Sequence, residues 1–376
     1  MMENKIMEYI DRNKEQMYQM LKELCEIPAP SHFEHKRAEY CKNWLDQAGA
    51  EGVYIDEAEN VVFPLNCEGS REITVFVAHT DTVFPDTEPM PYYEEDGRIY
   101  SPGVADDTAS VVVLMMMAKF FVEEKLTPAK GILFVCNSCE EGLGNLKGTR
   151  QIFEDFAGQI GQFISFDSSL DVIADRCVGS HRYQVEVFTE GGHSYGAFGN
   201  KNAIAELAGI VNNIYQIEVP QKEGSRTTYN VGEISGGTSV NTIAQNAQML
   251  CEYRSTDKEC LDIMEAKFEA IFEAARSPKV QVHVTKVGDR PCSNIEAGKV
   301  EALKQVVAPV IEQVIGAPMS YCSMSTDCNI PLSLGVPALC VGVNTHEKIH
   351  TREEWVDKAS LIPGLEIAIR LGCVLA

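Results

Sequence analysis

The sequence predicts an α/β protein with a mostly parallel central sheet, interrupted by a smaller α+β domain. Up to about residue 178, short strands of the fully buried type alternate with helical segments, which is typical of a parallel sheet. Between about 179 and 290 the strands instead alternate polar and apolar residues. After Pro291 the first pattern returns. We therefore expect one domain built from residues 1–178 and 291–376, with residues 179–290 inserted into it.

The first part of the chain begins with apolar residues at helical spacing, which predict a helix over 5–25. Pro28 and Pro30 end it, and Ser31 is expected to cap a second helix that runs to about residue 48. The run 73–78 is almost entirely apolar or β-branched and predicts a strand covered on both faces. The remaining expected elements of this part are a helix over 108–124 and strands at 131–136 and 163–166.

The inserted segment has the element order β-α-β-β-α-β, which predicts a split βαβ sheet with one open face. Its expected strands and helices cover 182–188, 202–216, 227–234, 248–254, 258–275 and 280–287 in turn. After Pro291 we expect a helix over 300–315, a strand at 338–342 and a C-terminal helix from about 358.

Composition excludes several classes of protein. The formal net charge is −23 and no Lys/Arg-rich run offsets it, which argues against binding to nucleic acid. No apolar stretch approaches the roughly 18 residues that a membrane span needs, and the N-terminus lacks the features of a secretory signal. The 13 cysteines show no framework spacing and are interpreted as reduced, buried thiols. We expect a cytoplasmic protein without membrane or nucleic-acid partners.

Acidic and imidazole side chains recur at the C-terminal ends of the predicted strands, where open α/β sheets place their ligand sites. His79 follows the first buried strand and precedes Asp81 by two residues, so that His79 suits a metal ligand whose tautomer Asp81 fixes. Taken alone, a His-x-Asp pair is more often a hydrogen-bonded loop pair.

Asp106 and Asp107 stand directly before a long apolar helix. Such acids either cap the helix and face the positive end of its dipole, or bind a cation. Capping explains one of them, with Asp107 or Thr108 as the cap, and leaves Asp106 as a metal ligand.

Glu140 and Glu141 follow another buried strand, and two adjacent carboxylates are costly there unless a cation lies between them. We expect Glu141 to bind the metal and Glu140 to act as the general base. Asp167 follows the next strand, and His350 lies between the last strand and the last helix. Together with His79 and Asp106, these residues make a plausible ligand set for two zinc ions that share one carboxylate.

With these motifs the chain resembles the co-catalytic zinc exopeptidases and deacylases, a family that includes aminoacylase, glutamate carboxypeptidase, succinyl-diaminopimelate desuccinylase and peptidase T. Five motifs match in order over nearly the whole chain: His79-Thr80-Asp81-Thr82, Gly103-Val104-Ala105-Asp106-Asp107, Cys139-Glu140-Glu141-Gly142, the strand end at Asp167, and His350-Thr351-Arg352-Glu353-Glu354. The resemblance implies that His79, Asp106 and Asp167 hold one zinc. Asp106, Glu141 and His350 would hold the other, so that Asp106 bridges the two ions.

The resemblance also implies that the inserted domain is a ferredoxin-like lid through which the chain forms a homodimer. There His193 would stabilise an oxyanion, often in the partner's active site, Asn241 would contact the substrate, and Arg254 would grip a substrate carboxylate. Without the resemblance, His193 is as well explained as a loop histidine and Arg254 as a surface charge.

The predicted activity is hydrolysis of an amide bond in a small substrate, with exopeptidase action on di- or tripeptides as the leading expectation. An N-acyl-amino-acid deacylase needs the same metals and base and is the alternative. A non-catalytic metal-binding protein is the remote alternative, because it predicts the loss of a ligand or of Glu140, and all six positions are intact. Zinc is the expected metal, although cobalt and manganese suit the same ligands.

Overall fold

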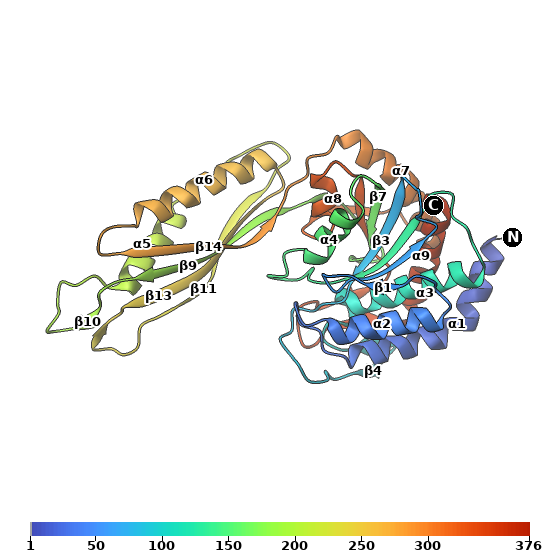
Figure 1. The fold of residues 1–376 in the computed structure, drawn as a ribbon, viewed down its shortest axis with the longest axis horizontal. Coiled ribbons are helices and arrows are strands. Elements are labelled where there is room, and N and C mark those ends of the chain that lie inside the picture. The colour runs from blue at the N-terminus through green and yellow to red at the C-terminus, as the bar shows by residue number, and fades with distance from the viewer. Residues whose placement is uncertain (1) are drawn as a thin grey trace. The chain divides into compact units, whose positions relative to one another are not determined.

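The chain divides into two units in the computed structural model, which describes residues 2–376 (Figure 1). The larger unit comprises residues 2–177 and 294–376, and the inserted unit comprises residues 178–293. The chain therefore passes between the units within three residues of the boundaries expected from the change in strand pattern.

An eight-stranded sheet with the order β1-β2-β6-β3-β7-β16-β8-β15 forms the centre of the larger unit. Neighbouring strands are parallel from β6 to β16, whereas β1, β2 and β6 pair antiparallel, as do β16 and β8. The mostly parallel sheet is thus confirmed. Its strands are β1 (Tyr54–Ile55), β2 (Val61–Leu65), β3 (Ile73–His79), β6 (Ile132–Asn137), β7 (Ile160–Ser165), β8 (Val172–Cys177), β15 (Ser320–Met324) and β16 (Ala338–Val341).

Apolar packing on both faces explains why the central strands are continuous hydrophobic runs. All seven residues of β3 are buried, and the Phe76 ring stacks on Phe134 of β6 and on Phe166 behind β7. The helices of this unit are α1 (Met2–Cys25), α2 (His35–Gln47), α3 (Ala109–Glu123), α4 (Lys147–Asp155), α7 (Ala297–Ile315), α8 (Asn329–Ser333) and α9 (Leu361–Leu375). Helix α3 is buried over twelve of its fifteen residues, which accounts for its apolar composition.

The start of α2 differs from the prediction. The helix begins at His35 with Glu34 in the N-cap position, so Ser31 does not cap it. The Ser31 hydroxyl instead donates to the Asp81 carboxylate at 2.7 Å. The acceptor of this hydroxyl group is 50 residues away in the sequence, so a local sequence pattern could not predict the bond.

A second sheet of four short strands brings the His350 segment to the segment before α3. Its order is β17-β18-β5-β4, and it was not predicted because its strands have two or three residues each. They are β4 (Tyr93–Glu95), β5 (Arg98–Tyr100), β17 (His346–Glu347) and β18 (Trp355–Asp357). His350 lies in the loop between β17 and β18, and Asp106 follows β5 by six residues, so this sheet joins two predicted ligand segments from opposite ends of the chain.

The inserted unit is a four-stranded antiparallel sheet with the order β11-β13-β9-β14 and two helices (Figure 1). Apolar residues of both helices pack against alternate residues of the strands, and the other face of the sheet carries the polar residues. This is the predicted split βαβ topology. Its elements are β9 (Gly179–Phe188), α5 (Ala203–Ile214), β11 (Thr227–Gly236), β13 (Asn246–Ser255), α6 (Lys258–Ala274) and β14 (Gln281–Arg290).

A two-residue ladder lies beyond the main strands of this unit. Strand β10 (Gly192–His193) pairs with β12 (Thr242–Ile243), so that His193 and Thr242 are partners. The described residues 2–376 contain no helix with the length and apolar composition needed to cross a bilayer.

Candidate metal centre

Adjacent strand ends bring the predicted site residues of the larger unit together. His79 ends β3 and is the register partner of Asn137, which ends β6 and precedes Glu140 by three residues. On the other side of β3, Phe166 donates its backbone N–H to Val77 at 2.9 Å, and this bond holds Asp167 beside the same sheet edge. Because parallel strands end at one edge, three of the motifs converge there.

The ligand atoms of His79, Asp106 and Glu141 all lie within 4.8 Å of one another. His79 Nε2 is 3.0 Å from Asp106 Oδ1. His350 Nε2 is 3.0 Å from both Asp106 Oδ2 and Glu141 Oε1. Asp106 thus faces one imidazole with each of its carboxylate oxygens, which is the placement that a bridging ligand requires.

The donor chemistry of this group fits a cation. His79 Nδ1 lies 3.0 Å from the Asp81 carbonyl oxygen, which can only accept, so Nδ1 carries a proton. Nε2 is therefore the nitrogen that would offer its lone pair to a cation once the ring is neutral. Burial and then the Asp106 charge raise the pKa of Glu141 to about 7, whereas Asp106 and Glu141 raise the pKa of His350 to about 10. A divalent ion would meet these lone pairs and negative charges at once.

Asp81 contacts the His79 ring through two of its oxygens and also holds a second segment of the site. Its backbone carbonyl accepts from the His79 ring, and its carboxylate oxygen lies farther from that ring, at 3.3 Å. The fully buried carboxylate accepts the backbone N–H groups of Glu140 at 3.0 Å and Glu141 at 2.9 Å, in addition to the Ser31 hydroxyl. Asp81 therefore connects the His79 segment to the segment of the predicted base.

The expected helix cap is found in position only: Thr108 is the N-cap residue of α3, but its side chain makes no cap bond. Asp107 is fully buried, and its carboxylate accepts the backbone N–H of His79 at 3.0 Å. The Thr108 hydroxyl instead donates to Gly103 at 2.6 Å. The Asp107 carboxylate thus binds the backbone N–H of His79 at the end of β3 rather than the N–H groups at the start of α3.

Glu140 and Asp167 complete the predicted set. Glu140 is buried, and its backbone is held by Asp81. Asp167 lies outside the group of three ligand atoms, but burial and the nearby Asp106 charge raise its pKa well above the usual value. Both side chains belong to the same electrostatic cluster, because Glu140 also raises the pKa of Asp167.

Two buried carboxylates near the site were not predicted in these roles. Glu354 accepts the backbone N–H groups of Gly103, Ala105 and Asp106 at 2.8–3.0 Å and so fixes the loop that carries Asp106. Asp327 is fully buried and accepts from Asn137 and Thr149 at 2.7 and 2.5 Å. Burial, followed by Glu140, raises the pKa of Asp327 to about 7. The strand-end pattern predicts candidate ligands, but not the carboxylates that hold their segments in place.

The predicted residues of the inserted unit fall into two places. His193 and Asn241 are exposed neighbours on the β10–β12 ladder, where the Ser194 backbone N–H donates to the Asn241 carbonyl at 2.9 Å. His193 Nδ1 accepts backbone N–H groups from Tyr195 and Gly196 at 3.2 and 3.3 Å, so its Nε2 carries the proton and can donate. Gly192 (φ 135°) is required here, because a Cβ would approach Ala197 to 2.7 Å.

Arg254 lies near the other end of this sheet, at the end of β13, and is already paired. Its Nε and Nη2 donate to the Glu252 carboxylate at 2.7 and 3.0 Å, and the same carboxylate also accepts from Arg182 at 3.3 Å. Within the inserted unit, therefore, Arg254 is not brought together with His193 and Asn241.

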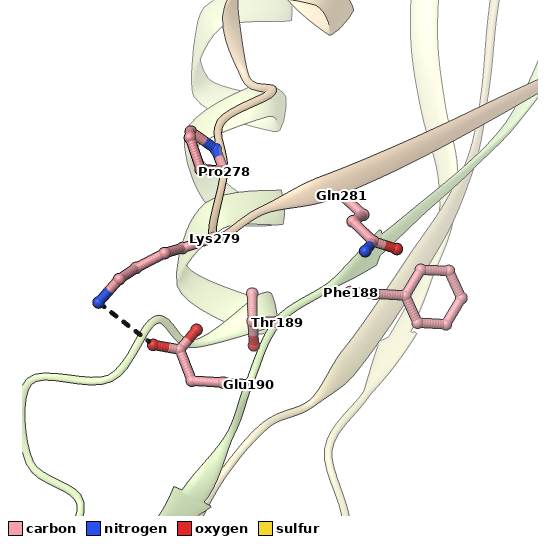
Figure 2. Close-up of a pocket in the computed structure, with 6 residues that line it drawn as sticks. All are labelled: Phe188, Thr189, Glu190, Pro278, Lys279 and Gln281. Carbon is pink, nitrogen blue, oxygen red and sulfur yellow. Dashed lines mark ion pairs between the residues drawn. The ribbon is translucent and has the colours of Figure 1, made fainter.

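A hollow at the β9–β14 edge of the inserted unit contains none of the predicted residues (Figure 2). It is lined by Phe188, Thr189, Glu190, Pro278, Lys279 and Gln281. Figure 2 shows the only charged side chains of this lining, Glu190 and Lys279, pointing toward each other at 3.9 Å, at the far limit of an ion pair. We assign this hollow no function.

All 13 cysteines are free thiols, and ten of them are buried, as the sequence predicts. Cys136 belongs to the core side of β6, whereas the Cys139 thiol contacts the Glu34 carboxylate at 3.3 Å.

Comparison with known proteins agrees with these features. Residues 75–372 match the sequence profile of peptidase family M20/M25/M40. A putative succinyl-diaminopimelate desuccinylase of Mycobacterium tuberculosis is 22% identical over 92% of this chain and 95% of its own length. The crystal structure of aminopeptidase PepT from Bacillus cereus (21% identity, TM-score 0.73) covers 96% of this chain and 98% of that chain. The dipeptidase Dug1p of Saccharomyces cerevisiae (15% identity, TM-score 0.76) covers 99% and 98%.

Because the profile match spans most of the chain, the protein belongs to peptidase family M20/M25/M40. It is an enzyme for the hydrolysis of amide bonds in small substrates, with a cluster of His, Asp and Glu ligand atoms at the strand ends. The predicted family is confirmed by this match.

Proposed function

We propose that the chain is a two-zinc exopeptidase that hydrolyses di- or tripeptides. The observation that carries the proposal is the cluster of His79, Asp106, Glu141 and His350, in which Asp106 faces one imidazole with each carboxylate oxygen. Asp167 would supply a further ligand to the ion that His79 would hold. When bound, such a pair of ions polarises the amide carbonyl and lowers the pKa of water toward neutrality.

In this proposal Glu140 accepts the proton of the attacking water and passes it to the leaving amine. Its backbone is fixed by the Asp81 carboxylate, which also fixes that of Glu141, so base and ligand keep a constant separation. The His193 Nε2–H group donates to the carbonyl oxygen as negative charge develops there. This donor comes from the exposed ladder of the inserted unit, which we propose acts as a lid and as the contact of a homodimer.

Arg254 would bind the carboxylate at the end of the substrate, and Asn241 would contact its backbone. The Glu252 side chain already occupies two donors of Arg254, so a substrate carboxylate has to bind its remaining Nη1 edge or displace Glu252. We place the enzyme in the cytoplasm, where dipeptides and tripeptides are released by protein turnover.

Deacylation of N-acyl-amino acids is the second candidate, because the relatives include a putative desuccinylase that aligns with nearly the whole chain. A panel of di- and tripeptides, measured beside N-acetyl- and N-succinyl-amino acids with added zinc, separates the two. We expect the highest kcat/KM for peptides with a free N-terminus. Turnover confined to acylated amino acids would replace the proposed substrate and leave the metal chemistry intact.

A further inference from the structure

The first turn of helix α2 and its N-cap contact three of the four segments that carry the proposed ligands and base in the first half of the chain, namely those of His79, Asp106 and Glu140–Glu141. The Arg37 guanidinium donates through Nη1 to the carbonyl oxygen of Thr80, which lies between His79 and Asp81, at 2.9 Å. The same nitrogen reaches the hydroxyl oxygen of Thr108, two residues after Asp106, at 3.0 Å. One planar group thus bridges two segments that are 28 residues apart in sequence.

Glu34 holds the third segment. Its Oε1 accepts the backbone N–H of Cys139 at 2.9 Å, directly before Glu140 and Glu141. Glu34 stands in the N-cap position of α2, yet its carboxylate makes no bond to its own helix. An N-cap side chain usually accepts a hydrogen bond from the first turn of its own helix. The Glu34 carboxylate instead accepts one from the segment that carries Glu140 and Glu141.

The burial of both charges is costly and calls for a reason. Arg37 is 1% exposed and Glu34 is fully buried. The hydrogen-bond partners of Arg37 among residues 2–376 are two carbonyls and a hydroxyl, and its Nη2 has none, so no direct ion pair compensates the charge. An apolar side chain would serve packing at this position at least as well.

The charge has a counterpart in the proposed metal centre. Burial lowers the pKa of Arg37, whereas the nearby thiols of Cys25 and Cys41 and the carboxylates of Asp81 and Glu34 act in the opposite direction. Asp81 is also the group that holds Glu140 and Glu141. A buried cation behind these carboxylates keeps the acid-rich strand ends in place without occupying a ligand position.

We propose that Arg37, together with Glu34, is a positioning residue for the metal centre. Arg37 locks the His79 and Asp106 segments at ligand distance before an ion binds, and Glu34 does the same for the Glu140–Glu141 segment. This inference rests on the proposed metal-dependent function, and it adds a support that none of the strand-end motifs contains.

The test measures zinc affinity rather than activity. The full-length protein is stripped of metal, and zinc binding is followed by competition with a chromophoric chelator for the wild type and for Arg37→Met, Arg37→Lys and Glu34→Gln. Leu45→Ala is the matched control, because Leu45 is a buried residue on the same helix, about 12 Å farther along its axis. Thermal unfolding of each apo protein measures the general loss of stability.

We expect Arg37→Met to weaken zinc binding by about 10- to 100-fold, as is typical when a group that orients metal ligands is removed. Glu34→Gln should weaken it less, because an acceptor remains, and Arg37→Lys should lie between wild type and Arg37→Met, because charge remains but the fork is lost. Leu45→Ala should lower the apo unfolding temperature while its zinc affinity stays near the wild-type value.

The inference is overturned if Arg37→Met binds zinc like the wild type, or if Leu45→Ala loses as much affinity at an equal loss of stability. Should Arg37→Met not fold, the same two criteria apply to Arg37→Lys. A wild-type protein that binds no zinc would overturn the proposed function, and this inference with it. Normal binding by the wild type together with unchanged variants overturns this inference alone.

Discussion

The two units carry most of their candidate residues in opposite ways, and His350, whose side chain is 52% exposed, is the exception in the larger unit. In the larger unit, His79, Asp81 and Glu140 are at most 4% exposed, and the Asp81 carboxylate alone accepts three hydrogen bonds. In the inserted unit, His193 and Asn241 are exposed, and their neighbours Tyr195 and Val240 are 90% and 102% exposed. The metal centre is therefore organised by its own unit, whereas the ladder residues are organised only locally and presented outward.

This difference in exposure suggests that the two units have different roles in the proposed reaction. Groups that must act on a bound ion have to be fixed in advance, because small displacements of ligands or base are costly in rate. Groups that act on the developing charge of a substrate can arrive with the element that carries them. Variants in the larger unit should therefore affect metal binding or chemistry, and variants on the ladder should affect chemistry alone.

The strongest test of this division is Glu140→Gln. The change removes the base but retains a side chain of the same size, so we expect kcat to fall by about 10³- to 10⁴-fold. Zinc content, measured by elemental analysis, should stay at the wild-type level. Activity close to that of the wild type would contradict the role of Glu140, and loss of zinc would instead make it a ligand.

His193→Ala should have the next largest effect. Loss of one donor to the developing oxyanion lowers kcat by about 10²-fold. Because His193 is exposed and bonds only to its own loop, zinc affinity and the unfolding temperature should not change. If the variant loses zinc, the ladder is part of the metal centre and the contrast between the units fails.

The smallest expected effect concerns the stability of the inserted unit. Asp289 lies 3.5 Å from His181 Nε2 and 3.5 Å from Lys286, and the hydrogen bond with His181 is the main reason that its pKa is lowered to about 2. A folded-state pKa below the usual 3.8 means that the ionised form stabilises the fold. That contribution is complete above about pH 4 and disappears as the pH falls toward 2.

Asp289→Asn should therefore cost about 1 kcal/mol at pH 7, a value reduced from the full shift because the side chain is half exposed. Hydrogen exchange of the backbone amides in β9 and β14, followed at increasing urea concentration, measures this difference in unfolding free energy within the inserted unit. The difference in unfolding free energy between the variant and the wild type should become smaller below pH 4. A difference that does not change with pH would assign the effect to packing.

Most of the fold follows from local patterns. The central strands are recognisable because burial on both faces demands continuous apolar runs, and the β-α-β-β-α-β order of the inserted unit because half-exposed strands alternate. Short strands and strands with charged residues are the elements that the sequence pattern does not predict. Strand β8 contains Asp175 and Arg176, and the strands of the second sheet have two or three residues, so pairing rather than composition defines them.

The candidate ligands could be predicted because acidic and imidazole groups recur near the ends of several predicted strands, although each of these groups alone has an ordinary local explanation. The residues that hold them were not. Asp107 accepts from His79 across 28 residues, and Glu354 accepts from the Asp106 loop across about 250 residues. Such bonds join segments that only the tertiary fold brings together, and the same residues have ordinary local roles in the sequence.

The amino-acid sequence by itself thus determined the strand ends, the acid and imidazole groups placed on them, and the topology of both units, since each depends on neighbours along the chain. The tertiary structure decided which candidate ligands lie together, which carboxylates accept backbone bonds, and that Arg37 is buried beside the segments that carry them. Those choices depend on distances between segments, and sequence spacing does not contain such distances.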